Sequence, residues 1–325
     1  MTLAVVGAGC GGADANTSLA TAGPSASASL PATPKTGFGR WPVQWDVKAE
    51  PEIDRIVITD KEVVAFGRRS TSAYSRADGH VLRTTRRGCM VLDAAVEKNG
   101  DFTVVCPGEI RSVDKKTLDY KVLQSFDESA VAASFMPDTL AIEVLAPGGS
   151  MAKKTGLGVE IVLYDRATRK PKRTLPAETH ALSLAGSESG LLVAVFQKGV
   201  ELNQGDSSTW RPFVQGSAPL VAVPSPAGNR VYLTSKPSET IAVDVATAKV
   251  VRAWRGFTPT RAAWIREEAV AAVGSFEGIR IFELDGQEVV SPHEVPYQAI
   301  TVPPDGSALC AHAAQTTELS CYFDR

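Results

Sequence analysis

Short apolar runs separated by turn-forming residues repeat along most of this chain, most clearly within residues 218–254. Four β-branched or aromatic-rich runs occur there, at 221–223, 230–234, 240–243 and 250–254. The residues between them are rich in Pro, Gly, Asn, Asp and Ser, so the pattern predicts four short β-strands. A lone four-stranded sheet that is apolar on both faces cannot shield itself from water. The unit must therefore stack against copies of itself.

The chain contains seven such units. Each has an aspartate in the turn after its third predicted strand, and these are Asp78, Asp114, Asp165, Asp206, Asp244, Asp285 and Asp324. The spacing is about 40 residues, with one longer step, and that period is typical of propeller blades. An aspartate suits such turns because its side chain accepts hydrogen bonds from the following backbone N–H groups. The sequence thus predicts an all-β fold, a seven-bladed β-propeller of four-stranded antiparallel blades.

Three short motifs make the pattern resemble a known family. They are Ser-Pro-Ala-Gly at 225–228, Val-Asp-Val-Ala-Thr at 243–247 and Pro-Asp-Gly at 304–306. Together they resemble the YVTN and WD40-like bacterial β-propellers over residues 41–325. The seventh unit ends after its third strand, whereas the strand-like segment 41–47 precedes the first unit without a partner. We expect this segment to pair in the blade of 318–324 and to close the ring, which removes the free sheet edges.

Four cysteines lie within the repeats. A hairpin turn at Gln315-Thr316 places Cys310 directly opposite Cys321, at a separation that a disulfide can bridge. A turn at 99–100 places Asp93 opposite Cys106, so Cys89 must reach Cys106 from the connection before the strand. Two disulfides imply an oxidising compartment. The alternative is four buried, reduced thiols.

The N-terminal residues indicate export. Residues 1–10 form a short apolar run that ends in small residues and Cys10, and this resembles the end of a bacterial lipoprotein signal peptide, whose cysteine is lipidated. The run is too short for a whole signal peptide, which a start codon assigned too late would explain. Residues 11–38 are rich in Ala, Ser, Thr and Pro and predict a disordered tether before a propeller at 39–325. The alternative is a disordered tail with an incidental cysteine.

The distribution of charge indicates candidate binding residues at two places in the chain. The net charge is −2 over 325 residues, so there is no electrostatic case for a nucleic-acid partner. The first unit is nevertheless locally basic, and a glycine-rich insertion at 146–158 carries two lysines. The candidate partner-binding residues are Arg68, Arg69, Arg76, Arg83, Arg86, Arg87, Lys153 and Lys154. The alternative interpretation is ordinary solvated surface.

Catalytic motifs are weak. Residues 148–155 resemble a phosphate-binding loop, but Lys153 replaces the second glycine and a strand follows instead of a helix. The histidines have no metal-ligand spacing. The predicted inner strands offer Asp93, Ser183 and Arg261 as polar groups. The five tryptophans are expected to pack between blades; they are Trp41, Trp45, Trp210, Trp254 and Trp264.

These observations favour an exported, lipid-anchored envelope protein that binds a protein or cell-wall partner through rim loops. We expect no catalytic residue, metal or cofactor, and a monomer or a subunit of a hetero-complex. One alternative is a propeller hydrolase or lactonase with a metal in the central channel. Another is a relative of quinoproteins, because residues 242–249 partly resemble the repeat of pyrroloquinoline quinone enzymes, with Ala248 where glycine is usual.

Overall fold

A computed structural model describes residues 41, 43–126, 129–146, 158–216, 221–236, 238–274, 278–285, 288–290, 295–313 and 315–323. All of them belong to the unit Lys35–Arg325. Their strands form seven sheets, each of four antiparallel strands. In these ranges no helix has the length and apolarity needed to cross a membrane.

The strands of the first four blades run in chain order from the inside to the outside of each sheet. Blade 1 comprises β2 (Ile53–Ile58), β3 (Glu62–Gly67), β4 (Thr71–Ser75) and β5 (Val81–Thr85). Blade 2 comprises β6 (Asp93–Val96), β7 (Phe102–Cys106), β8 (Glu109–Val113) and β9 (Tyr120–Ser125). Blade 3 comprises β10 (Ser129–Phe135), β11 (Thr139–Ala146), β12 (Gly158–Asp165) and β13 (Pro171–Pro176). Blade 4 comprises β14 (Ser183–Gly186), β15 (Leu191–Phe196), β16 (Gly199–Gln204) and β17 (Arg211–Gln215).

The last three blades complete the ring. Blade 5 comprises β18 (Ala222–Pro224), β19 (Arg230–Lys236), β20 (Glu239–Asp244) and β21 (Val250–Arg255). Blade 6 comprises β22 (Pro259–Ile265), β23 (Ala269–Gly274), β24 (Ile279–Glu283) and β25 (Glu288–Val290). Blade 7 comprises β26 (Ala299–Thr301), β27 (Ala308–Ala313), β28 (Glu318–Phe323) and β1 (Val43–Lys48).

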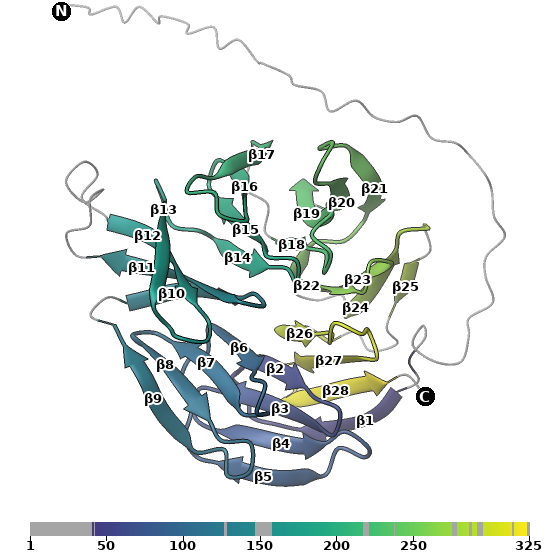
Figure 1. The fold of residues 1–325 in the computed structure, drawn as a ribbon. Helices are drawn as coiled ribbons and strands as arrows, with labels where there is room; N and C mark the ends of the chain where they lie inside the picture. Colours follow the sequence, from purple (N-terminus) through teal and green to yellow (C-terminus); the bar gives the residue numbers. More distant parts are fainter. Residues whose placement is uncertain are drawn as a thin grey trace, which may run out of the picture. The chain divides into compact units, whose positions relative to one another are not determined.

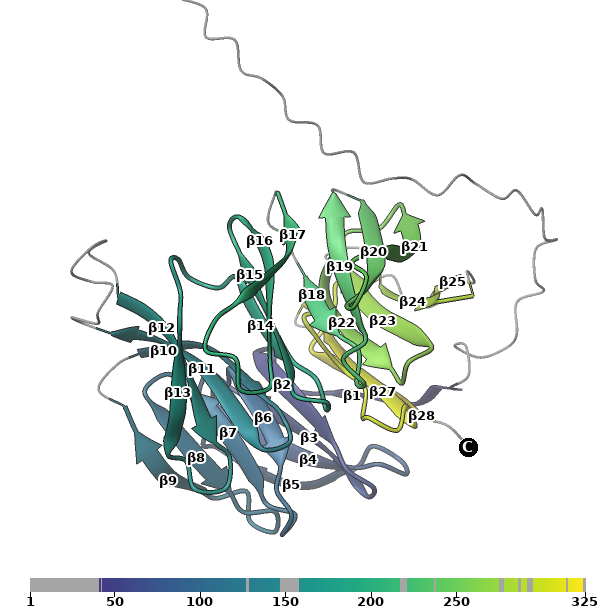
Figure 2. The same ribbon diagram turned by 45° about the horizontal axis from the view of Figure 1, so that its top comes forward.

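The innermost strands of successive blades contact one another around a closed ring, and β26 of blade 7 lies against β2 of blade 1. Figures 1 and 2 show the sheets arranged around this ring of inner strands. The sequence-based prediction of a seven-bladed propeller with four-stranded blades is confirmed.

The predicted closure by the N-terminal strand is also confirmed. Strand β1 pairs antiparallel with β28, with Trp45 opposite Cys321 and Val47 opposite Leu319. The buried Trp41 indole donates a hydrogen bond from Nε1 to the Gly306 carbonyl at 3.1 Å. The Trp45 indole donates to the Arg76 carbonyl of blade 1 at 3.1 Å. The N-terminal segment thus supplies the outer strand of blade 7 and also contacts blade 1.

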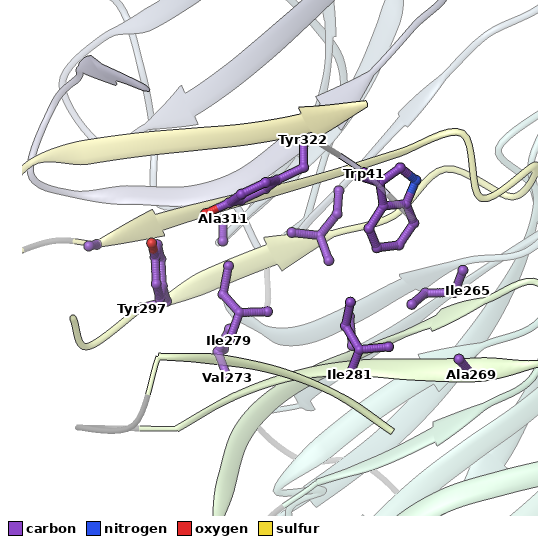
Figure 3. Close-up of a cluster of buried hydrophobic side chains, with 12 residues drawn as sticks. Trp41, Ile265, Ala269, Val273, Ile279, Ile281, Tyr297, Ala311 and Tyr322 are labelled. Carbon is purple, nitrogen blue, oxygen red and sulfur yellow. The ribbon is translucent and has the colours of Figure 1, made fainter. Parts of the chain in front are cut away.

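The core lies between neighbouring blades. Each second strand is covered on both faces, so its apolar run is continuous instead of alternating, as in the fully buried strands β15, β23 and β27. Figure 3 shows one such cluster, which contains Trp41, Tyr297 and Tyr322 together with Ile279 and Ile281 of blade 6. The other four tryptophans also pack against core clusters or aromatic rings. Their predicted role in packing is confirmed.

The aspartate turns have the structural role expected from the sequence. Oδ1 of Asp114, Asp165 and Asp244 each accepts a hydrogen bond from the backbone N–H three residues later, at 2.8 Å in each case. The chain then adopts a left-handed conformation one residue further on, with φ of 58° at Arg169 and 54° at Ala248. A Cβ is sterically unfavourable in this conformation. This explains why the pyrroloquinoline quinone repeat that residues 242–249 partly resemble usually has glycine at the position of Ala248.

One predicted register was wrong. Asp93 faces Val105 and not Cys106, because Val96 pairs with Phe102. The Glu97 N–H donates to the Asp101 carbonyl at 2.8 Å, so the loop inside this pair has three residues, 98–100, with Gly100 in the left-handed region at φ 84°, whereas the prediction assumed a two-residue turn. A loop with one more residue shifts the pairing by one position, so that each residue of β6 faces a different residue of β7 than predicted.

Candidate binding site

An open cleft of about 500 Å³ lies between blades 1 and 2. Its lining residues are Arg68, Arg69, Arg86, Arg87, Gly88, Arg111, Tyr120 and Val122. The first arginine pair follows β3, and the second lies in the connection from β5 to β6. Four of the candidate partner-binding residues therefore come together. Whether they bind a partner remains a prediction.

Propeller geometry explains this convergence. Successive strands of a blade alternate in direction, so the turn between the second and third strands lies on the same face as the connection to the next blade. Gly88 lets the two arginine-bearing segments approach each other. A Cβ at this position would lie 2.2 Å from the Gly67 carbonyl oxygen and 2.9 Å from that of Arg68. Any larger residue at position 88 must push these backbones apart.

The cleft carries an excess of positive charge. Nε of Arg68 lies 3.6 Å from Oδ1 of Asp54, and Nε of Arg69 lies 3.8 Å from Oε2 of Glu52. Arg111 pairs with Glu109 within blade 2. The exposed Arg86 and Arg87 have no carboxylate within 4.0 Å among the residues that the structure describes. Oε1 of a fourth carboxylate, Glu50, accepts from the Arg69 backbone N–H at 3.1 Å. Five guanidinium groups thus face four carboxylates, which leaves a formal surplus of one positive charge.

One wall of the cleft is less polar. The Tyr120 hydroxyl forms a 2.6 Å hydrogen bond with Oγ1 of Thr71, and burial raises the pKa of this tyrosine. The Arg111 guanidinium stacks over the Tyr120 ring at 5.7 Å from its centroid. Beside it, Val122 is 50% exposed. The cleft therefore combines free cationic donors with an aromatic and aliphatic surface.

A disulfide holds the second arginine pair in place. Cys89 directly follows Gly88, and it is bonded to Cys106 at the end of β7, with a Cα–Cα distance of 6.0 Å. Two residues further along, the Val91 N–H donates to Oδ2 of Asp54 at 3.0 Å. As predicted, Cys89 lies in the connection before β6. The arginine connection is thus tied to blade 2 by a covalent bond and to blade 1 by a hydrogen bond.

The second predicted disulfide is also present. Cys310 lies opposite Cys321 in the pairing of β27 with β28, and the two are bonded at a Cα–Cα distance of 4.2 Å. Two disulfides are consistent with a protein of an extracellular or periplasmic compartment.

Two of the predicted arginines lie elsewhere and stabilise the fold. Arg76 donates to Oγ of Ser307 at 2.9 Å and lies over the Phe323 ring at 5.1 Å, so it links blade 1 to blade 7. Arg83 pairs with Glu62 and donates to the Lys115 carbonyl of blade 2. Since their guanidinium groups already have partners at blade interfaces, these residues do not belong to the cleft.

The polar groups of the inner strands form another cluster. Arg55 Nε lies 3.5 Å from Oδ1 of Asp93, and Oδ2 of Asp93 accepts from the Phe135 N–H at 2.8 Å. Burial raises the pKa of Asp93 against the opposing effect of Arg55. The pKa of Arg261 is lowered mainly by burial and, to a smaller extent, by repulsion from the positive charge of Arg55. Asp93 thus ties three blades together, whereas Ser183 makes no comparable contact among the described residues.

A buried glutamate was not found from the sequence. Oε1 of Glu143, in β11, accepts hydrogen bonds from Nδ1 of His180 at 3.0 Å and from the Ala181 N–H at 3.1 Å. Burial raises the pKa of Glu143, and the hydrogen bond from His180 opposes this shift. The glutamate anchors the connection between blades 3 and 4. The sequence feature that could have identified it is a charged residue within the apolar run 140–144.

Other candidates cannot be placed in the structure. Cys10, Lys153 and Lys154 lie outside the described residues. In the part of the chain that is described, no three His, Cys, Asp or Glu side chains are grouped so that they could hold a metal ion. No protein-family model matches the chain, and no curated protein matches it significantly.

Proposed function

We propose that this protein is a non-catalytic binding scaffold of the bacterial cell envelope, and that it binds its partner through the arginine-lined cleft between blades 1 and 2. The observation that carries this proposal is the convergence of two exposed arginine pairs from separate rim segments. Arginine is well suited to such a site because its planar guanidinium forms paired hydrogen bonds with anionic groups. The partner is a protein or cell-wall component that presents negative charge.

The proposed location rests on two independent features. The disulfides suit an oxidising compartment. The run that ends at Cys10 resembles a lipoprotein signal, and the composition of residues 11–38 suits a tether between an acylated cysteine and the propeller. Cys10→Ser should release the full-length protein into the soluble fraction, whereas retention in the membrane fraction would contradict lipid anchoring.

Site-specific photocrosslinking tests the cleft as a binding surface. A photoreactive amino acid at Val122, inside the cleft, is compared with one at Val250 on β21 of blade 5, a valine that is also exposed. Both full-length variants are expressed in the native host and irradiated. We expect a discrete crosslinked species from position 122 and none from position 250. A species from position 250 alone would place the partner elsewhere, and equal crosslinking at both positions would indicate random collision.

A further inference from the structure

We propose that the arginine-lined cleft recognises a phosphate group on a flexible, soluble polyol chain, such as a glycerol or sugar phosphate. This inference rests on the proposed function and adds the chemistry of the ligand. It draws on the charge of the cleft, on the directions from which its donors approach and on the character of the adjoining pocket.

The unpaired arginines suit a phosphate. Arg86 and Arg87 have no carboxylate within 4.0 Å among the described residues, and the cleft keeps a net positive charge when Glu50 is counted with the other three carboxylates. The pairs of Arg68 and Arg69 are long, at 3.6 and 3.8 Å, and they involve exposed guanidinium groups, so a ligand can share these donors at little energetic cost. A phosphate monoester has a charge between −1.5 and −2 near neutral pH.

The arrangement of donors favours phosphate over carboxylate. Guanidinium groups enter the cleft from the β3–β4 turn, from the β5–β6 connection and from β8. A planar carboxylate has two oxygens, and a single guanidinium fork can satisfy both of them. A phosphate has oxygens that point in several directions, so it can accept from three separate segments at once.

A neighbouring pocket of about 320 Å³ indicates what the phosphate is attached to. It shares Arg68 with the cleft and is otherwise lined by Pro51, Glu52, Ile53, Asp54, Gln298 and Gln315. The two carboxylates repel a second phosphate and accept hydrogen bonds from hydroxyl groups, whereas the two amides can both donate hydrogen bonds to hydroxyl groups and accept them. Together the two pockets fit a phosphate followed by a hydroxylated carbon chain.

The cleft is already organised for binding. The close approach at Gly88, the Cys89–Cys106 disulfide and the Val91–Asp54 hydrogen bond restrict the connection that carries Arg86 and Arg87. Because this backbone is restricted before the ligand arrives, binding loses little backbone conformational entropy, and the remaining ordering cost falls on the arginine side chains. The cleft is also concave and lies between two blades. This shape favours a single group on a flexible chain over the flat surface of a bilayer.

Isothermal titration calorimetry of the full-length protein at low ionic strength tests this proposal. The probes are glycerol 3-phosphate, inorganic phosphate, malonate, and vesicles of phosphatidylcholine with phosphatidylglycerol. The proteins are the wild type, an R86Q/R87Q variant and a K249Q/R252Q control, whose two exposed cations lie on blade 5. We expect glycerol 3-phosphate to bind more tightly than phosphate, and phosphate more tightly than malonate. R86Q/R87Q should weaken glycerol 3-phosphate binding at least about 10-fold, and the control should leave it unchanged.

Three results would overturn the ligand assignment: malonate that binds as tightly as phosphate, phosphate binding that survives in R86Q/R87Q, or binding of the anionic vesicles alone. Thermal unfolding of both variants checks that the fold is retained. The photocrosslinking at Val122 separates the two proposals. A crosslinked partner with no phosphate binding refutes the ligand class and leaves the binding scaffold intact, whereas loss of both refutes the cleft as a site.

Discussion

His312 should make the propeller sensitive to mild acid. Its side chain in β27 is fully buried. Burial lowers the pKa of His312 from 6.5 to about 4, and the backbone of Glu50 opposes this shift only in part. The folded protein therefore keeps this histidine neutral at a pH where the unfolded chain protonates it.

The sign and size of the effect follow from these pKa values. Because the unfolded state binds more protons below pH 6.5, the stability contributed by neutral His312 is complete above that pH and is lost as the pH falls toward 4. One pKa unit corresponds to about 1.4 kcal/mol, so the free energy of unfolding should fall by about 2 kcal/mol between pH 7 and pH 5. Asp165, with its pKa lowered to about 2, does not titrate in this window.

His312→Leu should remove this dependence. Urea unfolding of the wild type and the variant at pH 7 and pH 5 gives the two changes in free energy, and the difference between them isolates His312. Buried Asp93 and Glu143 have raised pKa values and contribute with the opposite sign, but they do so equally in both proteins. If both proteins lose the same stability between pH 7 and pH 5, His312 is not held neutral by burial.

Three further predictions concern stability and the cleft. Replacing Cys310 and Cys321 with serine should lower the free energy of unfolding by about 3 kcal/mol, from the chain entropy of a loop closed across 11 residues, and should leave glycerol 3-phosphate binding unchanged. Replacing Cys89 and Cys106 with serine should lower stability by a similar amount, given their separation of 17 residues, and should also weaken binding in calorimetry; unchanged binding would show that the disulfide does not position the arginines. Ala248→Gly should raise the free energy of unfolding by about 1 kcal/mol, measured in urea, because Ala248 has a φ of 54°; a loss of stability would contradict this.

Repetition made the fold predictable from the sequence. The aspartate turns recur once per blade, so weak local signals reinforced one another and gave the number of blades. The missing strand of the last unit and the unpaired segment before the first unit then required the closure seen in β1. The pairing of Cys310 with Cys321 followed from a short hairpin. The pairing of Asp93 failed because the length of a glycine-containing loop depends on backbone conformation, which composition does not reveal.

The cleft was only partly predictable. The basic composition of the first unit identified the arginines, but the sequence did not separate Arg76 and Arg83, which hold neighbouring blades, from the four that line the cleft. Arg111 and Tyr120 were missed because they belong to the next repeat. Which loops share a rim follows from strand direction, whereas side-chain partners depend on packing across blades.

Binding of an anionic partner between blades 1 and 2 can be tested directly. The measurement is the affinity of the full-length protein for envelope components of its native host, which are solubilised and then immobilised on a surface. The wild type, R86Q/R87Q and K249Q/R252Q are compared. We expect a loss of at least about 10-fold in affinity for R86Q/R87Q and wild-type affinity for K249Q/R252Q. Equal affinity of all three proteins, or an equal loss in both variants, would contradict a specific site at the arginine-lined cleft.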